Sequence, residues 1–517
     1  MSSDIINALC RSGAFFDQGE VEIVETHISW VVLAGEYAYK FKKPVDLGFV
    51  NFTSIERRAY YCEEEIRLNR RLAPDLYVGV VKITGPLESP ELEGPGEVLD
   101  YAVKMSRFPA DRELSHMIKT RLPPPEAFYQ LATDLAVFHD SVAIADQQSS
   151  FANPDVLASV EMDNFKVINK FIHEPGLLAR LQSLEAWTKT SLINLEKNFH
   201  HRKLAGRVRE CHGDLHLGNL VYLNDQIIPF DCLEFNPGLR WIDVASELAF
   251  LLMDLFVNQY ERIGRMMLDR YLESSGDYEL VTLLQHYLVY RAMVRAKVSC
   301  LQRPGDNESN DRQGDFIRYL DFAERITAPV YGLKLIITCG FSGSGKTWIS
   351  NHLVERATVI RVRSDVVRKQ MHGLGLAESS ESGIDSGIYT RSATQDVYQE
   401  LGRLVDLILD AGYSVVVDAS FLRKEHRDKF AALAEKHAVM FTILHIDAPY
   451  DVLASRIDAR QQSGSDASEA GMAVVDNQRL YYDSLDSMES EHAVKIDSTL
   501  NQKQILSLLE PLVLNQD

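Results

Sequence analysis

The pattern of apolar and polar residues changes twice along the chain. Residues 20–43 alternate in short β-rich segments around Gly35, and a helical stretch that closes at Pro74 follows. Two further strand-like segments come before residue 108. A period of two predicts strands with one buried face. We therefore expect residues 1–108 to form a small β-sheet with one helix.

Long helical periodicity replaces this alternation from about residue 123. In "PEAFYQLATDLAVFHDS" the apolar residues Phe128, Leu131, Leu135 and Phe138 fall on one face, as in a helix that packs on a core. Further long helical stretches continue to about residue 330. The pattern predicts a helical region over residues 109–330.

A third pattern begins at residue 333. Short apolar segments such as "LKLIITC", "YSVVVD" and "MFTILHI" alternate with helical stretches. Strands that alternate with helices are typical of a parallel sheet. The sequence thus predicts an α/β domain over residues 331–517.

Composition limits the class of protein. The 517 residues are 46% hydrophobic, the six cysteines form no C-x-x-C pair, and no apolar run reaches 18 residues. We therefore expect a cytoplasmic protein without a membrane segment, a disulfide framework or a zinc site. The formal net charge of −20 disfavours long nucleic acid as a partner, because wrapping it needs a basic surface.

A glycine-rich loop stands between the first apolar strand and a helix of the third region. "GFSGSGKT" fits the phosphate-binding pattern G-x-x-x-x-G-K-[ST], in which backbone N–H groups face the β-phosphate. The lysine of this pattern reaches the β- and γ-phosphates, and the hydroxyl after it reaches Mg²⁺. The expected nucleotide-binding residues are Gly340, Ser342, Gly343, Ser344, Gly345, Lys346 and Thr347, with Thr347 also a metal ligand.

Three polar residues follow later strands of this domain. Asp365 ends the second strand, at the sheet edge where substrates bind in such folds, and a carboxylate there can accept the proton of a hydroxyl. Arg368, one turn later, can bind an anionic part of the acceptor. Asp418 has the place of a carboxylate that contacts Mg²⁺. The alternatives are a helix cap at Ser364 or Asp365 and a turn residue at Asp418.

Two arginines form the last element of this set. Arg456 and Arg460 are four residues apart on one predicted helix face, before a loop that can fold over ATP as a lid. A solvated charged face is the alternative. Together these residues resemble the small P-loop kinases, which include gluconate and shikimate kinases, polynucleotide 5′-kinases and zeta-toxin-like proteins. The resemblance covers about residues 333–500 and implies phosphoryl transfer from ATP to a hydroxyl.

The segment "ECHGDLHLGNL" carries a second set of residues. Asp214 is a candidate proton acceptor for a hydroxyl, and the amide oxygen of Asn219 can coordinate a metal ion on the same phosphate. Asp231, at the end of an apolar run, supplies the second carboxylate. The alternative for Asp214 is a turn or a helix cap.

A cation for the phosphates and its partner are expected in the first region. In "YAYKFKKPV" Lys40 and Lys42 alternate onto one face, and the helical stretch offers Glu65, with Glu64 as the alternative. A solvated edge strand is the other interpretation of "KFKK".

This order of elements resembles a protein-kinase-like fold, and "HGDLHLGN" resembles the aminoglycoside phosphotransferase and choline kinase branch over about residues 20–300. The resemblance implies Asp214 as catalytic base, Asn219 and Asp231 as Mg²⁺ ligands, Lys40 (or Lys42) as the phosphate clamp, and a structural role for His212. One departure is the lack of a G-x-G-x-x-G turn between the first strands.

The whole chain resembles bacterial proteins described as bifunctional aminoglycoside-phosphotransferase-like and P-loop ATP-binding proteins. The expected fold class is an α+β protein-kinase-like domain, with an N-lobe at 1–108 and a C-lobe at 109–330, followed by an α/β P-loop kinase domain at 331–517. The expected function is phosphotransfer from Mg–ATP at two sites to small-molecule hydroxyls. Three alternatives stay open: activity of the P-loop kinase alone, with the first domain as sensor; phosphorylation of a 5′-hydroxyl end; and a nucleotide-driven binding switch.

Overall fold

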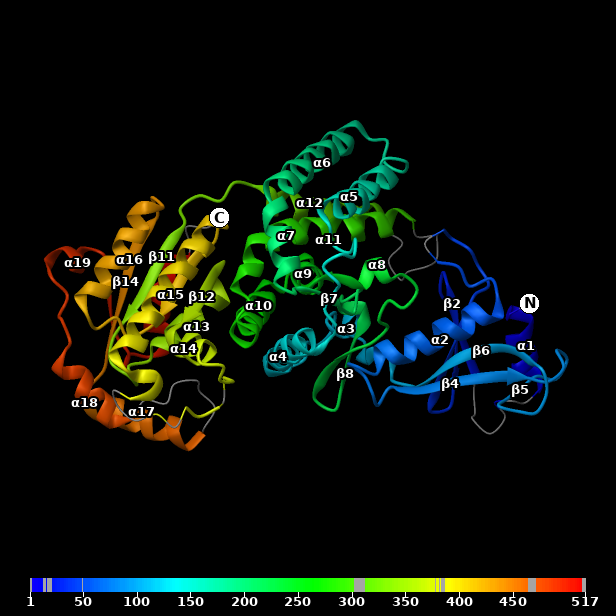
Figure 1. Cartoon of the computed structure of the whole chain (residues 1–517), viewed down its shortest axis with the longest axis horizontal. Coiled ribbons are helices and arrows are strands. Elements are labelled where there is room, and N and C mark those ends of the chain that lie inside the picture. The colour runs from blue at the N-terminus through cyan, green and yellow to red at the C-terminus, as the bar shows by residue number, and fades with distance from the viewer. Residues whose placement is uncertain are drawn as a thin grey trace. The chain divides into compact units, whose positions relative to one another are not determined.

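The structure is a computed structural model of the whole chain, and it describes residues 2–12, 15, 21–48, 50–301, 312–376, 378–380, 382, 386–463 and 471–513. The chain forms two compact units (Figure 1). The first contains residues 1–259 and 286–327, and the second contains residues 260–285 and 328–517. The predicted boundary near residue 330 lies close to the last of these cuts, whereas residues 260–285 group with the second unit instead of the predicted C-lobe.

The first lobe of unit one is a six-stranded sheet in the order β1-β2-β3-β6-β4-β5 with a helix on each face. In β3 the alternation places Tyr39 and Phe41 in the core with α1, while Lys40 and Lys42 face the side of α2. Because β3 lies between β2 and β6, "KFKK" is not an edge strand. The elements are α1 (Ser2–Ser12), β1 (Val21–Glu25), β2 (Ser29–Ala34), β3 (Tyr37–Lys42), α2 (Ile55–Asn69), β4 (Tyr77–Thr84), β5 (Glu91–Leu92) and β6 (Val98–Ser106).

The second lobe of unit one is helical and holds two small antiparallel sheets, β10-β7 and β8-β9. Its elements are α3 (Leu114–Met117), α4 (Pro125–Ser141), α5 (Pro154–Ile168), α6 (Pro175–Asn194), α7 (Glu196–Leu204), β7 (Val208–Glu210), β8 (Leu220–Leu223), β9 (Gln226–Pro229), α8 (Pro237–Arg240), β10 (Trp241–Asp243), α9 (Val244–Val257) and α12 (Arg312–Thr327). Helix α11 (Val281–Leu301) begins in the second unit and ends in the first. Helix α9 is buried along most of its length, as the apolar run "LAFLLMDLFV" requires.

The second unit is built on a five-stranded parallel sheet in the order β12-β13-β11-β14-β15. Its elements are α10 (Glu261–Ser275), β11 (Lys334–Cys339), α13 (Lys346–Arg356), β12 (Val359–Arg363), α14 (Ser364–Met371), α15 (Arg391–Asp410), β13 (Ser414–Asp418), α16 (Lys424–Lys436), β14 (Met440–Asp447), α17 (Tyr450–Ser463), α18 (Met472–Leu480), α19 (Ser487–Glu491), β15 (Ala493–Asp497) and α20 (Gln502–Val513). The predicted α/β fold with a parallel sheet is confirmed.

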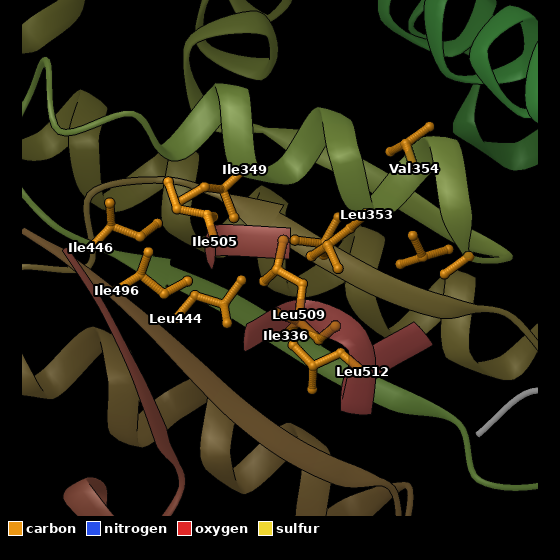
Figure 2. Close-up of a cluster of buried hydrophobic side chains, with 13 residues drawn as sticks. Ile336, Ile349, Leu353, Val354, Leu444, Ile446, Ile496, Ile505, Leu509 and Leu512 are labelled. Atoms are coloured by element: carbon orange, nitrogen blue, oxygen red, sulfur yellow. The ribbon is translucent and has the colours of Figure 1, made fainter. Parts of the chain in front are cut away.

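Helices α13 and α20 cover one face of this sheet. Side chains from β11, β13, β14 and β15 interdigitate there with both helices, and Figure 2 shows Ile336, Leu444, Ile349 and Leu509 within this cluster. Such burial of branched aliphatic side chains stabilises the fold by about 1.5–3 kcal/mol per side chain. The core holds the end of β11 and the start of α13 in place, and the glycine-rich loop connects these two elements.

Among the described residues, no helix combines the length and the apolar character that a bilayer crossing needs.

Candidate functional site

The two predicted lysines and the helix glutamate meet in the first unit. Lys40 Nζ lies 2.9 Å from Glu65 Oε1 and 2.5 Å from Asp231 Oδ1. Lys42 Nζ lies 2.7 Å from Glu65 Oε2 and also contacts Glu234. Alternation in β3 puts both amines on one face, where α2 presents Glu65. The structure therefore brings together Lys40, Lys42, Glu65 and Asp231, and adds Glu234.

Electrostatics keep Lys40 and Glu65 ionised although both side chains are buried. Burial raises the pKa of Glu65, but Lys40 and Lys42 outweigh burial and bring that pKa down to about 2. Burial works against the charge of the Lys40 amine, yet Asp231 and Glu65 raise its pKa above the ordinary value. A cation that stays charged beside an accessible carboxylate can bind phosphate oxygens.

The hairpin β8–β9 brings the metal-binding candidates together. Asn219 directly precedes β8. Phe230 directly follows β9, and Asp231 is the next residue. The Phe230 N–H donates to the Asn219 carbonyl over 2.9 Å. The Asp231 N–H donates to Tyr77 Oη over 3.0 Å, which holds Asp231 at a φ of 62°. The base of the hairpin thus places Asn219 and Asp231 side by side.

Asp214 and Asn219 are joined directly. Asn219 Nδ2 donates to the Asp214 carbonyl over 2.9 Å and to Asp214 Oδ2 over 3.1 Å. This leaves the Asn219 amide oxygen as a ligand atom for a metal ion. Asp214 is not a helix cap, because His216 caps the short 3₁₀ turn Leu217–Asn219 by accepting the Gly218 N–H. With side chains that are 38% and 42% exposed, Asp214 and Asp231 are accessible carboxylates. An amide oxygen and two carboxylates fit a hard cation such as Mg²⁺.

The charge state of Asp214 suits a proton acceptor. Burial raises its pKa, but His216, whose Nε2 lies 3.5 Å from Asp214 Oδ2, together with Arg295 and His212, holds that pKa below its ordinary value. The carboxylate is therefore ionised at neutral pH.

Buried residues that the sequence analysis did not single out hold this loop. Glu247 of α9 accepts the N–H groups of His212 and Gly213, both over 2.7 Å, and Asp254 accepts the Leu217 N–H over 2.9 Å. His212 itself contacts the Phe230 carbonyl through Nε2 over 2.9 Å. The sequence signal that could have identified Glu247 and Asp254 is a pair of carboxylates seven residues apart in an otherwise apolar helical stretch.

Gly213 is required by the conformation of the loop. Its φ is 91°, and a Cβ at this position would lie 3.0 Å from the Leu239 carbonyl oxygen and 3.1 Å from Arg240 Cβ. A side chain would push the loop away from α8, so glycine is the residue that fits.

The glycine-rich loop of the second unit has the form of a phosphate cradle. A Cβ at Gly340 would lie 2.3 Å from the Ile446 carbonyl oxygen, and Gly343 and Gly345 have φ values of 80° and 98°. The loop ends at Gly345, which is the N-cap of α13, so the helix N-terminus faces the cradle. Ser344 Oγ is buried and has no hydrogen-bond partner among the described residues. The loop therefore fits a nucleotide phosphate.

Lys346 lies among the predicted acidic residues. Its Nζ donates to the Phe341 carbonyl over 2.8 Å. Burial lowers the pKa of the amine, against the attraction of Asp418 and Asp365. Asp418 ends β13 and accepts the Ser350 hydroxyl over 3.1 Å. Asp365 lies in the first turn of α14, whose N-cap is Arg363, so Asp365 does not cap that helix.

The remaining predicted residues of this unit have structural partners. Arg456 Nη1 lies 3.4 Å and 3.3 Å from the Gly343 and Ser344 carbonyls, and Arg460 Nη2 lies 3.4 Å from Ser342 Oγ. Arg368 donates to the Ile388 carbonyl over 2.6 Å, so it anchors the segment that follows α14.

Three further placements complete the set. The Ser342 N–H donates to Gln478 Oε1 over 2.9 Å, a contact that the sequence did not predict. Thr347 is half-buried in the first turn of α13. Most of the loop after Arg460, residues 464–470, lies outside the described residues, so the lid stays a prediction.

Comparison with known proteins gives the following matches. A family model described as an AAA domain matches residues 335–485. The chain is 28% identical to a Mycobacterium tuberculosis protein named Uncharacterized protein Rv2004c over 472 residues, which is 90% of this chain and 92% of the relative. A Mycobacterium bovis protein named Uncharacterized protein Mb2027c matches to the same extent.

Solved structures of kinases are similar to parts of the chain. Amicoumacin kinase hAmiN is 14% identical, with 63% of this chain and 97% of that chain covered and a TM-score of 0.39. A choline/ethanolamine kinase family protein from Mesorhizobium loti is 12% identical, with 63% and 96% covered and a TM-score of 0.39. A sugar kinase from Janibacter sp. HTCC2649 is 20% identical, with 35% and 96% covered and a TM-score of 0.28.

The predicted resemblance is confirmed at the level of fold. The first unit has a protein-kinase-like fold, with the strand lysine, the helix glutamate and the Asp214–Asn219 loop at the expected places. The second has a P-loop kinase fold with a parallel sheet, and the family model matches residues 335–485 within it.

Proposed function

We propose that the chain transfers the γ-phosphate of ATP to hydroxyl groups of small molecules at two separate sites, one in each unit. The observation that carries the proposal is the contact of Lys40 with both Glu65 and Asp231. Through this contact the Lys40 amine lies beside the base of the β8–β9 hairpin. Asn219 stands at that base and contacts Asp214. The second site rests on the Gly340–Thr347 cradle with Lys346, Asp365 and Asp418 around it.

The first site divides the reaction among its residues. Lys40, oriented by Glu65, binds phosphate oxygens of ATP. Asn219 and Asp231 would hold Mg²⁺, which would supply positive charge on the phosphates. The acceptor hydroxyl attacks the γ-phosphorus, the bond to the β–γ bridging oxygen breaks, and the hydroxyl proton passes to the ionised Asp214 carboxylate. ADP and a phosphate monoester leave.

The second site performs the same exchange with different groups. Backbone N–H groups of the cradle and Lys346 bind the phosphates, while Thr347 and Asp418 would hold Mg²⁺. Asp365 accepts the proton of the acceptor hydroxyl. Arg456 and Arg460 lie along the cradle and add positive charge beside the nucleotide.

A screen of a metabolite library by mass spectrometry tests the proposal. We expect wild type to add one phosphate to at least one hydroxyl compound, Asp214→Ala to lose the products of the first site, and Lys346→Ala to lose those of the second. Loss of every product in Lys346→Ala alone contradicts two active sites. No phosphorylated product in wild type, with ATP still bound, indicates a binding switch.

One observation favours a second candidate function, in which the first unit senses nucleotide without catalysis. The turn between β1 and β2 consists of Thr26, His27 and Ile28, with Thr26 Oγ1 accepting the Ser29 N–H over 3.0 Å. This turn has no glycine to approach the phosphates. In this case the P-loop kinase alone is active.

The proposal also covers the class of acceptor at the P-loop site. We expect a small molecule, because the net charge of −20 disfavours an oligonucleotide. Transfer of labelled phosphate to a 5′-hydroxyl oligonucleotide by wild type, lost in Lys346→Ala, would contradict this choice.

A further inference from the structure

The edge strand β12 of the second unit carries a buried arginine, Arg361, and a half-buried one, Arg363, and both contact helix α10. Arg361 donates to both carboxylate oxygens of Asp269, with Nε 3.1 Å from Oδ1 and Nη2 2.6 Å from Oδ2. Arg361 Nη2 also donates to Glu273 Oε1 over 3.0 Å. Arg361, Asp269 and Glu273 are each at most 6% exposed. Charges buried this deeply need partners in well-defined geometry.

The same network continues to the predicted metal ligand Asp418. Arg363 Nη1 lies 3.5 Å from Glu273 Oε1, and Arg363 Nε lies 3.7 Å from Asp418 Oδ2. Arg363 and Asp418 are also paired in register across β12 and β13. One guanidinium is therefore shared between a carboxylate of α10 and the carboxylate beside Lys346.

A second branch reaches Asp418 through Ser350 of α13. Arg361 Nη1 lies 3.3 Å from Ser350 Oγ, and that hydroxyl donates to Asp418 Oδ2 over 3.1 Å. Asp418 thus has two neighbours, Ser350 and Arg363, whose positions depend on the carboxylates of α10.

Helix α10 is an integral part of the P-loop unit, although its sequence lies between α9 and α11 of the predicted C-lobe. Arg265 of α10 donates to the Val354 and Glu355 carbonyls in the last turn of α13, over 3.2 Å and 2.7 Å. An arginine that satisfies the last carbonyls of a helix caps its C-terminus. Helix α10 therefore contacts both α13, through Arg265, and β12, through Asp269 and Glu273.

We infer that Asp269 and Glu273 are positioning residues for the Mg²⁺–nucleotide site of the P-loop unit, an inference that rests on the function proposed for that site. Glu273 and Asp269 hold the two guanidinium groups on the α10 side. Without these carboxylates, Arg363 closes on Asp418, and its positive charge opposes Mg²⁺ at that carboxylate. Loss of Glu273 or Asp269 should weaken Mg²⁺ more than it weakens the nucleotide.

The test uses the full chain with Asp231→Asn, which removes the carboxylate among the two proposed metal ligands of the first unit. Binding of the nonhydrolysable analogue AMP-PNP is titrated calorimetrically at a series of Mg²⁺ concentrations. For Glu273→Gln and Asp269→Asn we expect the Mg²⁺ concentration at half-maximal binding to rise about tenfold, as for other residues that orient metal ligands. AMP-PNP affinity at saturating Mg²⁺ should change little. Glu355→Gln is the control, because the Arg262–Glu355 pair also joins α10 to α13 but does not reach Arg361.

Three results overturn the inference: an unchanged Mg²⁺ requirement in folded variants, an equal loss of Mg²⁺ and nucleotide affinity, or the same shift in Glu355→Gln. If Glu273→Gln does not fold, Arg363→Lys provides the test. A lysine amine cannot span Glu273 and Asp418 as the guanidinium does. Paired with Asp418 it raises the Mg²⁺ requirement, paired with Glu273 it lowers that requirement, and an unchanged requirement overturns the inference. If Lys346→Ala does not reduce AMP-PNP binding by the Asp231→Asn parent chain, the proposed function of the P-loop site is itself refuted. This result distinguishes failure of the proposed function from failure of the inference.

Discussion

At the scale of single residues, the two lysines of β3 have different tasks although they lie two positions apart. Lys40 reaches Asp231, whose side chain is 42% exposed, whereas Lys42 lies between Glu65 and Glu234 with no exposed side-chain surface. The first arrangement suits a group that binds a ligand. The second suits a group that neutralises two buried carboxylates.

Replacing each lysine by methionine separates the two tasks. Lys40→Met should abolish phosphotransfer at the first site with a small loss of stability, because Lys42 still pairs Glu65. Lys42→Met leaves two buried carboxylates with less compensation, which costs about 3–5 kcal/mol of unfolding free energy. Urea unfolding and product formation, measured on both variants, check this. Equal destabilisation by the two substitutions would contradict the assignment.

Glu247 makes the stability of the first unit dependent on pH. Burial raises its pKa, but His139, His212 and the Gly213 N–H outweigh burial and lower it to about 2. A carboxylate with a lowered folded pKa contributes stability above its ordinary pKa of 4.5, and this contribution is lost as the pH falls from 4.5 toward 2.

We therefore expect Glu247→Gln to be less stable than wild type by about 3 kcal/mol at pH 7. The gap should narrow steadily as the pH falls below 4.5. Melting temperatures between pH 3.5 and 7 measure this gap, with the exposed Glu196→Gln as control. A gap that does not change with pH would mean that the carboxylate charge is not what holds the loop.

At the scale of elements, the catalytic loop depends on the conformation of one glycine. Gly213→Ala should displace the His212–Asp214 loop, because φ is 91° and the new Cβ would meet Leu239 and Arg240. The strain costs about 1–3 kcal/mol, and activity of the first site should fall at least tenfold. Gly48→Ala is the matched control, since its φ is 80° but nothing lies within 4 Å of the new Cβ. If both variants lose stability and activity equally, the contact with Leu239 has no role.

Most elements and the clustering of the candidate site residues could be predicted, because local patterns encode them. Alternation in β3, the ordered motif around Asp214 and the glycine spacing of 340–347 each depend on nearby residues. The supports of the sites come from distant segments, and local patterns do not reveal them. Glu247, Tyr77 and Gln478 contact their loops across 34, 154 and 136 residues, respectively. The amphipathic pattern of α10 predicts a helix that packs on a core, but it does not indicate which unit contains that core.

At the scale of the whole molecule, one continuous stretch supports both candidate sites. Helix α9 holds the catalytic loop of the first unit through Glu247 and Asp254. Helix α10 begins four residues after α9 ends and contributes Asp269 and Glu273 to the second unit. Residues 244–285 therefore contribute elements to both compact units. A gene divided near residue 330 would encode α10 and its sheet in separate chains.

The stoichiometry of Mg²⁺-dependent AMP-PNP binding decides between one and two nucleotide sites on the chain. Isothermal titration calorimetry of the full chain should give two molecules bound per chain, and one in each of the variants Asp231→Asn and Lys346→Ala. One molecule per wild-type chain, lost completely in either variant, would contradict the account.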